Sequence, residues 1–124
     1  MGQKVAILGA SKKAGRYSYR AFKMLLEYGH TPVPITPKFS ELEGIQVFAG
    51  LRFVPFLIDT LTMYVGPEIS TELQAEIIAA KPRRIIFNPG SENYPLAQAL
   101  RAAEIPVVEA CTLVLLRTGE FEIG

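Results

Sequence analysis

The chain has 124 residues, 49% of them hydrophobic and 20% charged, which is ordinary for one globular domain spanning residues 1–124. Thirteen Lys and Arg residues nearly balance twelve Asp and Glu residues, giving a formal net charge of +1. This near-neutral charge argues against a protein built to bind nucleic acid or a membrane surface.

The first predicted elements are a strand and an amphipathic helix joined by a glycine-rich loop. Lys4–Leu8 is a short apolar run typical of a buried strand, and Gly9 ends it. Ser18–Tyr28 has helical periodicity, and Gly29 is placed to end this helix in the left-handed conformation. The residues expected on the buried face of the helix are Phe22, Leu25 and Leu26.

A second strand is predicted at Pro32–Thr36. Its prolines cannot donate hydrogen bonds to a neighbouring strand, so we expect it at or near a sheet edge. Residues 38–56 show no clear period, and we expect them to form an irregular segment anchored to the core by Phe48 and Leu51.

Leu57–Val65 is predicted to be the third strand. Thr71 and Gln74 have the spacing of a capping box, which predicts a helix that runs to Lys81-Pro82. The buried face of this helix is expected to carry Leu73, Ile77 and Ala80.

Two strands and one helix follow in the last third of the chain. Arg84–Phe87 and Val107–Glu109 are predicted strands, and Asn93–Ala103 is a predicted helix with Leu96 and Leu100 facing inward. Residues 111–121 are expected to add ordered apolar structure. Strands that alternate with helices indicate an α/β fold, a Rossmann-like three-layer sandwich with a mainly parallel sheet of five to six strands.

The loop from Gly9 to Ser18 is predicted to bind an anion. It follows a strand and precedes a helix, whose first N–H groups and positive dipole end favour a phosphate. Gly9 permits a sharp turn, Ser11 can donate a hydrogen bond, and Lys12, Lys13 and Arg16 add positive charge. Ligands of such sheets lie beyond the carboxyl ends of the strands, where this loop is expected.

The end of the second predicted strand carries a lysine where a fold that binds NAD carries an acid. In such folds an Asp or Glu about 20 residues past the glycines holds the ribose hydroxyls. Here the segment reads Ile35-Thr36-Pro37-Lys38, and the first carboxylate is Glu41, beyond the turn. A lysine accepts a phosphorylated ribose, so NADP and coenzyme A both fit, whereas NAD does not.

Several segments together resemble the small CoA-binding domain proteins, which are similar to the N-terminal domain of the succinyl-CoA synthetase α-subunit. The segments are VAILGAS…GRYSYRA, PVPITPK, DTLTMYVGPE, KPRRIIFNPGSEN and VVEACTLVLL, and they cover nearly the whole chain. One departure is Thr36, where many relatives have asparagine. The resemblance implies a protein that binds coenzyme A or an acyl-CoA.

The resemblance also assigns site residues. It implies that the phosphates lie along Gly9, Ser11, Lys12 and Arg16, with Ala10 in the same turn. It implies that Thr36, Pro37 and Lys38 flank the adenosine end, that Val65, Gly66 and Pro67 line the nucleotide, and that the loop of Asn88, Pro89 and Gly90 approaches it. Tyr17 and Tyr64 are candidates for packing on the ligand, or for the core.

No catalytic group or metal site is predicted. The related synthetases use a phosphorylated histidine on a separate domain, whereas the single histidine here, His30, follows Gly29 and is expected to cap a helix or face solvent. Asp59 is expected to accept backbone N–H groups near a strand start. Cys111 is expected to pack in the interior, with a mixed disulfide to coenzyme A as the alternative. We therefore expect no enzymatic activity from this chain alone.

Two other functions remain open: an NADP-binding reductase-type domain, and an interaction module that has lost its ligand, with a possible protein partner at an apolar patch around residues 53–57. A single cysteine excludes an internal disulfide. No signal peptide is visible, and the apolar runs are far shorter than the ~20 residues of a membrane span. We therefore expect a cytoplasmic protein.

Overall fold

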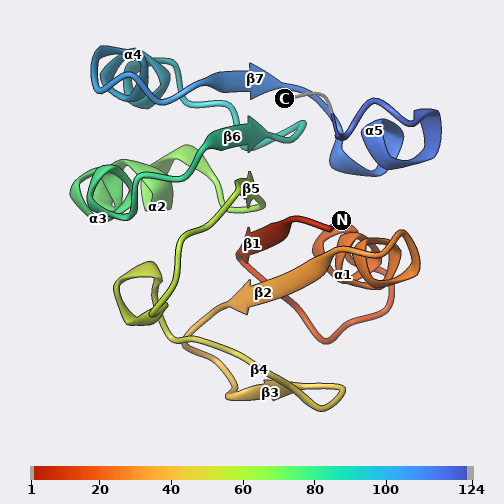
Figure 1. Cartoon of the computed structure of the whole chain (residues 1–124). Coiled ribbons are helices and arrows are strands. Elements are labelled where there is room, and N and C mark those ends of the chain that lie inside the picture. Colours follow the sequence, from red (N-terminus) through yellow and green to blue (C-terminus); the bar gives the residue numbers. More distant parts are fainter. Residues whose placement is uncertain (1, 123–124) are drawn as a thin grey trace.

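The computed structural model describes residues 2–122, which contain a five-stranded parallel sheet (Figure 1). The sheet has the order β2-β1-β5-β6-β7, and every neighbouring pair is parallel. Its strands are β1 (Lys4–Leu8), β2 (Thr31–Ile35), β5 (Thr60–Met63), β6 (Arg84–Phe87) and β7 (Val107–Glu109). This confirms the predicted α/β, Rossmann-like architecture.

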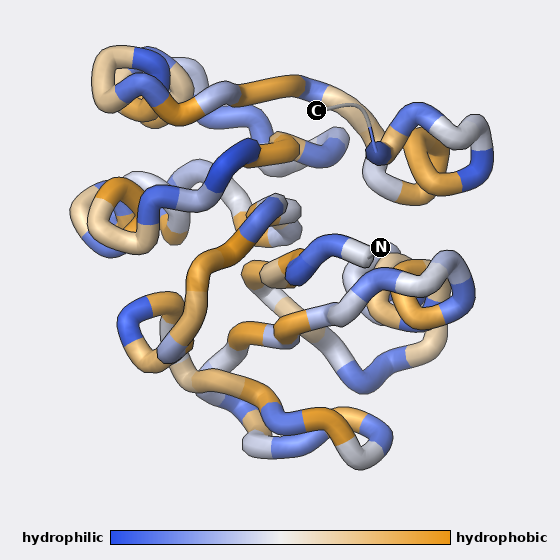
Figure 2. The backbone as a smooth tube through the Cα atoms, viewed as in Figure 1, coloured by the Kyte–Doolittle hydropathy of each residue, from blue (hydrophilic) through white to orange (hydrophobic). Residues whose placement is uncertain are grey.

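Helices cover both faces of the sheet. Figure 1 shows α1 (Tyr17–Glu27) and α5 (Thr112–Thr118) on one side, and α2 (Pro67–Glu72), α3 (Gln74–Ala80) and α4 (Tyr94–Ala102) on the other. Hydrophobic residues follow the strands and the inner sides of the helices in Figure 2, so an apolar layer lies on each face of the sheet.

Helix α1 packs and ends nearly as its sequence predicts. Phe22 and Leu25 are fully buried, but Leu26 is 42% exposed, so its predicted place on the buried face is wrong. Leu26 lies one position past Leu25, and a rotation of about 100° per residue carries it to the edge of the apolar stripe. Gly29 adopts a φ of +87°, and the N–H of His30 donates to the carbonyl of Leu25, which completes a Schellman ending.

Strand β2 lies at a sheet edge, as its prolines predict. Its free side is covered in part by the chain itself, because the N–H of Phe48 donates to the carbonyl of Pro34 and the N–H of Thr36 donates to the carbonyl of Phe48. This pairing anchors Phe48 against the core, and Leu51 is buried, as expected for both residues.

The segment predicted to be irregular contains a small hairpin, formed by β3 (Glu41–Leu42) and β4 (Ile45–Gln46), and a short 3₁₀ helix, η1 (Leu51–Phe53). Strands of two residues are too short to show a period. The turn residues Glu43 and Gly44 both have positive φ, and Glu-Gly is a weaker hairpin signal than Asn-Gly. The Glu43 carboxylate is held by Tyr19 and Lys23 of α1, which fixes the hairpin against that helix.

Two predictions in the middle of the chain are wrong in detail. The third strand is shorter than Leu57–Val65, and Leu57 is 76% exposed. Thr71 does not begin a helix, because α2 already starts at Pro67 after Gly66, and Pro at the first helical position is itself a strong start signal. The Thr71 hydroxyl instead accepts a hydrogen bond from the amide of Asn93, 2.9 Å away.

The remaining predicted elements are confirmed within one or two residues. Helix α4 begins after Asn93, whose side chain accepts the N–H of Leu96, and Leu96 and Leu100 are buried. Asp59 accepts the N–H of Lys4 at 2.8 Å, in the role predicted for it. Among residues 2–122, no helix is long and apolar enough to cross a bilayer.

His30 is buried, which corrects the expectation that its side chain might face solvent. Only 5% of the residue is exposed, and its ring meets the ring of Phe121 edge-on, with 5.0 Å between centroids. Nδ1 accepts the N–H of Gln3 at 2.9 Å, and Nε2 lies 3.5 Å from a carboxylate oxygen of Glu122. The backbone of His30 ends α1, as predicted, while its side chain joins the start and the end of the described chain.

Acidification is expected to destabilise the fold through His30. Burial lowers the pKa of His30, nearby Arg84 acts in the same direction, and Glu122 opposes both. Below pH about 6.5, the unfolded chain therefore binds more protons than the folded one. The free energy of unfolding should hold above that pH and fall as the pH drops below it. Urea unfolding at several pH values measures this effect. The free energy of unfolding should fall more steeply with decreasing pH in the wild type than in His30→Gln, and equal pH dependence of the two proteins would contradict the role given to His30.

Candidate functional site

A cleft of about 940 Å³ opens along the carboxyl ends of β1, β2, β5 and β6. This is where ligands bind in open α/β sheets. The predicted site residues that line it are Gly9, Ala10, Ser11, Lys12, Arg16, Tyr17, Thr36, Pro37, Lys38, Val65, Gly66 and Gly90. Pro67, the first residue of α2 after Gly66, is not among the lining residues, which differs from its predicted place.

The turn after β1 presents the start of α1 to the cleft. The cap residue Arg16 makes no side-chain hydrogen bond to the first turn, and that turn contains no acidic residue. The Ser11 hydroxyl oxygen accepts the N–H of Lys13 at 3.1 Å, which shapes the loop and leaves the hydroxyl proton available to a ligand. The helix start, its dipole and the hydroxyl therefore form a site suited to an anion.

Gly9 is required at this turn for two reasons. Its φ is +93°, and a Cβ there would lie 2.9 Å from the carbonyl oxygen of Tyr64 and 2.8 Å from the Val65 side chain. The N–H groups of Gly9 and Ala10 both donate to the carbonyl of Ile35. The ends of β1, β2 and β5 are thus held closely together beneath the cleft.

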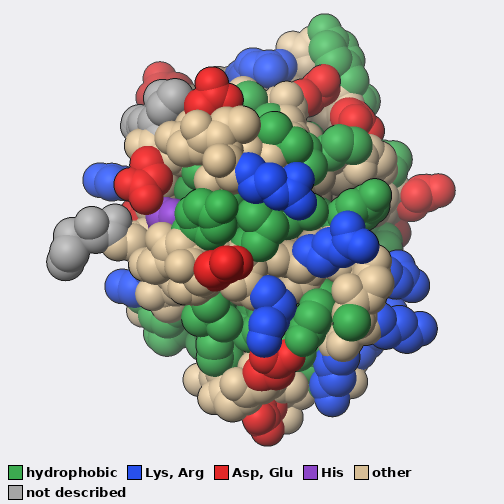
Figure 3. Space-filling model, turned by 90° about the vertical axis from the view of Figure 1, so that its right-hand side faces the viewer, with side chains coloured by type: hydrophobic (Ala, Val, Ile, Leu, Met, Phe, Trp, Pro, Cys, Tyr) green, Lys and Arg blue, Asp and Glu red, His purple; other side chains and the backbone are tan. Residues whose placement is uncertain are grey.

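Four cationic side chains line the same end of the cleft: Lys12, Lys13, Arg16 and Lys38. Lys12 is partly engaged, because its ammonium lies over the ring of Phe39 at 4.8 Å. Figure 3 shows Lys and Arg side chains grouped at the lower right of the α1 and α5 side. Positive charge is therefore concentrated locally in a chain whose net charge is only +1.

The end of β2 is built to turn sharply toward the cleft. Thr36 is buried, and its hydroxyl oxygen lies 3.4 Å from the N–H of Lys38, across the turn. This contact directs the chain outward after Pro37, so that Lys38 is exposed at the rim. Thr36 serves the turn with its hydroxyl, and Lys38 is the group that can reach a ligand.

The two tyrosines considered for ligand packing differ in position. Tyr17 is 65% exposed and lines the cleft, and the Arg20 guanidinium lies over its ring, 5.5 Å from the centroid. Tyr64 also lines the cleft, but its hydroxyl is buried, and burial raises its pKa to about 12. Nearby Thr112 and Thr62 oppose that rise, although the phenol oxygen meets neither in hydrogen-bond geometry. Tyr64 therefore belongs largely to the core.

A buried polar network supports the floor of the cleft, and sequence reasoning did not find it. The Asn88 amide donates to the Thr62 hydroxyl at 2.7 Å and to the carbonyl of Met63 at 2.8 Å, and its oxygen accepts the N–H of Thr112. Thr62 and Thr112 share a hydrogen bond of 2.7 Å. The network joins β5, β6 and α5, so Asn88 faces inward while Pro89, Gly90 and Ser91 line the cleft.

The cleft continues past the cations into a region that the sequence did not predict. It is lined there by residues from the η1 segment and from α2 and α3: Ala49, Gly50, Leu51, Arg52, Ile69, Leu73 and Glu76. These segments lie more than 15 positions apart in the chain and carry no local motif, so only the packing of η1 against α3 brings them together.

The other polar candidates lie outside the cleft. His30, Asp59 and Cys111 are not among its lining residues. Cys111 is a partly buried free cysteine at the start of α5. Within residues 2–122, no group of three or more His, Cys, Asp or Glu side chains is arranged to hold a metal ion.

Comparisons with known proteins identify one family. The model of the CoA binding domain family matches residues 3–117. The chain is 38% identical over 65 residues to an ADP-forming acetate–CoA ligase of Methanocaldococcus jannaschii, a match that spans 52% of this chain and 9% of the ligase.

Two solved structures resemble the whole chain. A crystal structure of an uncharacterized protein has a TM-score of 0.90 and 35% identity, covering 98% of this chain and 99% of its own. The structure of cell-free ID.343 from Thermus thermophilus has a TM-score of 0.89 and 27% identity, covering 97% and 91% of the two chains.

Proposed function

Because the chain belongs to the CoA binding domain family, we propose that it binds coenzyme A or an acyl-CoA in the cleft at the carboxyl ends of the strands. The residues there fit such a ligand. An uncapped helix start and four cations suit its phosphates, and a cleft of about 940 Å³ is in the size range of cofactor sites.

The observation that carries the proposal is that two separate segments, the turn after β1 and the turn after β2, bring positive charge to one end of the cleft. The turn of Ser11 and Arg16 faces one part of it, and Lys38 stands at the rim beyond β2. Coenzyme A has a pyrophosphate and a separate 3′-phosphate, so it needs two such sites. The pyrophosphate then lies at the start of α1, the 3′-phosphate at Lys38, and the pantetheine arm runs toward Gly90.

The proposed role is binding without a chemical step of the chain's own. The described residues that line the cleft include no His, Cys or Asp, and the hydroxyl of Tyr64 is buried. The match covers only 9% of the acetate–CoA ligase, so we do not infer the ligase activity for this chain. We propose that the chain holds coenzyme A for a partner that performs the chemistry.

A ligand panel tests this function directly. Thermal shift and titration calorimetry with coenzyme A, dephospho-CoA, NADP and NAD should show the strongest stabilisation with coenzyme A, because binding to the folded state alone raises the melting temperature. NADP as the strongest ligand would favour a reductase-type domain. No shift with any of the four would contradict the proposal.

Replacing Lys38 with alanine is expected to lower the affinity for coenzyme A roughly tenfold and to leave the affinity for dephospho-CoA nearly unchanged. The variant loses one charge-assisted hydrogen bond, which is worth about 1.5–3 kcal/mol, and only coenzyme A has the 3′-phosphate that accepts it. Calorimetry with both ligands measures the difference. Lys81→Ala, which changes an exposed lysine outside the cleft, is the control. An equal loss for both ligands would place the 3′-phosphate elsewhere.

A further inference from the structure

The cleft is electrostatically asymmetric along its length. Lys12, Lys13, Arg16 and Lys38 line one part, whereas a single carboxylate, that of Glu76, is found among the described residues that line the cleft. Glu76 belongs to α3 and lies at the other part, beside η1. Arg52 also lines this part, and its guanidinium lies 3.5 Å from the Glu76 carboxylate, so the pair is close to neutral overall. This part of the cleft is therefore less positive than the other part and suits an uncharged portion of the ligand that can donate a hydrogen bond.

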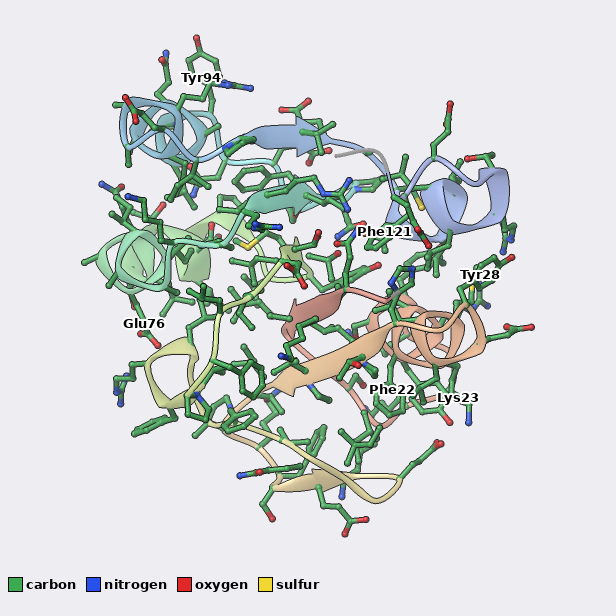
Figure 4. The ribbon with its side chains drawn as sticks, viewed as in Figure 1. Phe22, Lys23, Tyr28, Glu76, Tyr94 and Phe121 are labelled. Carbon is green, nitrogen blue, oxygen red and sulfur yellow. The ribbon has the colours of Figure 1, made fainter. Side chains whose placement is uncertain are left out.

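The Glu76 carboxylate is held in place by the η1 segment. One oxygen accepts the N–H of Arg52 at 2.9 Å, and the other lies 3.5 Å from the Arg52 guanidinium. Figure 4 shows the Glu76 side chain extending from α3 toward η1. The side chain is 18% exposed, so it is ordered by its partners and still accessible from the cleft.

Gly50 leaves room for this arrangement. A Cβ at Gly50 would lie 3.0 Å from the nearer carboxylate oxygen of Glu76, although the φ of −163° at Gly50 is extended backbone that any residue adopts. The glycine is therefore needed for the position of the carboxylate and not for the conformation of the chain.

Apart from Arg52, the side chains that line this part of the cleft beside the carboxylate are apolar. Leu51, Leu73 and Ile69 line the cleft next to Glu76, with Val65 at the tip of β5. Apolar walls with one fixed polar group are typical of a pocket for a flat heteroaromatic base, whose faces are apolar and whose edge donates and accepts.

We propose that Glu76 determines base specificity by accepting a hydrogen bond from the 6-amino group of adenine. This inference rests on the proposed binding of coenzyme A. A carboxylate only accepts hydrogen bonds, and the two contacts with Arg52 leave part of its four lone-pair positions available. Adenine presents a donor at position 6, whereas hypoxanthine presents an oxygen there, which the carboxylate would repel and leave unpaired.

The test compares coenzyme A with its hypoxanthine analogue, made by deaminating the base, by calorimetry. Wild-type protein should bind coenzyme A at least roughly tenfold more tightly than the analogue. Glu76→Gln keeps an acceptor for the Arg52 N–H and adds an N–H donor that can pair with the 6-oxygen of hypoxanthine. The ratio of the affinity for coenzyme A to the affinity for the analogue should therefore fall to within about twofold. Glu72→Gln, an exposed acid outside the cleft, should keep the wild-type ratio.

A second variant acts without changing the carboxylate itself. Gly50→Ala should displace the Glu76 carboxylate and lower the ratio, with the fold checked by its melting temperature. Equal binding of both ligands by the wild type, or an unchanged ratio in both Glu76→Gln and Gly50→Ala, would overturn the assignment. If the wild type does not bind coenzyme A at all, the proposed function itself is refuted, so the two failures are distinguishable.

Discussion

Replacing Ser11 with leucine is expected to lower the affinity for coenzyme A by roughly 100-fold or more, which corresponds to about 2.7 kcal/mol. Ser11 lines the cleft at the start of the turn that leads into α1. Leucine places an apolar, branched side chain where the pyrophosphate is proposed to lie, and it removes a hydroxyl donor. Hydrogen bonds to charged groups contribute about 1.5–3 kcal/mol each, so losing more than one produces this effect.

The fold should survive this substitution, because Ser11 is only partly buried and its hydroxyl makes one local contact, with the N–H of Lys13. Calorimetry with coenzyme A measures the affinity, and the melting temperature checks the fold. Ser11→Ala is the matched control, since it removes the hydroxyl without adding bulk and should weaken binding only about tenfold. Wild-type affinity in Ser11→Leu would place the pyrophosphate away from this turn.

Replacing Gly9 with alanine is expected to have the largest effect on stability, a loss of about 3 kcal/mol in the free energy of unfolding. The positive φ accounts for about 1–2 kcal/mol, because a Cβ is disfavoured in that region. The remainder comes from the new methyl group, which would lie 2.9 Å from the carbonyl oxygen of Tyr64. Tyr64 follows directly after β5, so relief requires a shift between strands.

Gly29→Ala separates these two causes. Gly29 has a similar positive φ of +87°, but a Cβ there would meet nothing within 4 Å. Its loss should therefore be only about 1 kcal/mol. Urea unfolding of both variants measures the difference. Equal losses would show that the contact of the new methyl group at position 9 with the Tyr64 carbonyl adds no cost to that of the positive φ.

The turn of the candidate site could be predicted because its signals are local. Gly9, Ser11 and the start of α1 lie within ten residues of one another, and their chemistry can be recognised without knowledge of the rest of the fold. The edge position of β2 follows from Pro32 and Pro34, which lack the N–H that an interior strand needs.

The second half of the cleft could not be predicted, because its residues are distant in the chain. Arg52 and Glu76 are 24 positions apart and meet only where η1 packs against α3. Asn88, Thr62 and Thr112 form their network in the same way, through the parallel pairing of β5 and β6 and the return of the chain into α5.

His30 shows both kinds of information in one residue. Its backbone role follows from the sequence, since Gly29 ends α1 in the left-handed conformation and the next N–H completes the motif. The burial of its side chain depends on Phe121, about 90 positions later, and no local pattern indicates that contact.

The sequence by itself determined the succession of strands and main helices along the chain, the parallel sheet and the glycine-rich turn that lines the cleft, because hydrophobic periodicity, glycines and prolines act over a few neighbouring residues. Only the tertiary structure decided which side chains are buried at helix margins, how residues 38–56 fold back along β2, and which carboxylate faces the cleft. Those outcomes depend on contacts between segments that are distant in the chain. Such contacts form, and contribute to stability, only once the sheet has brought the segments together.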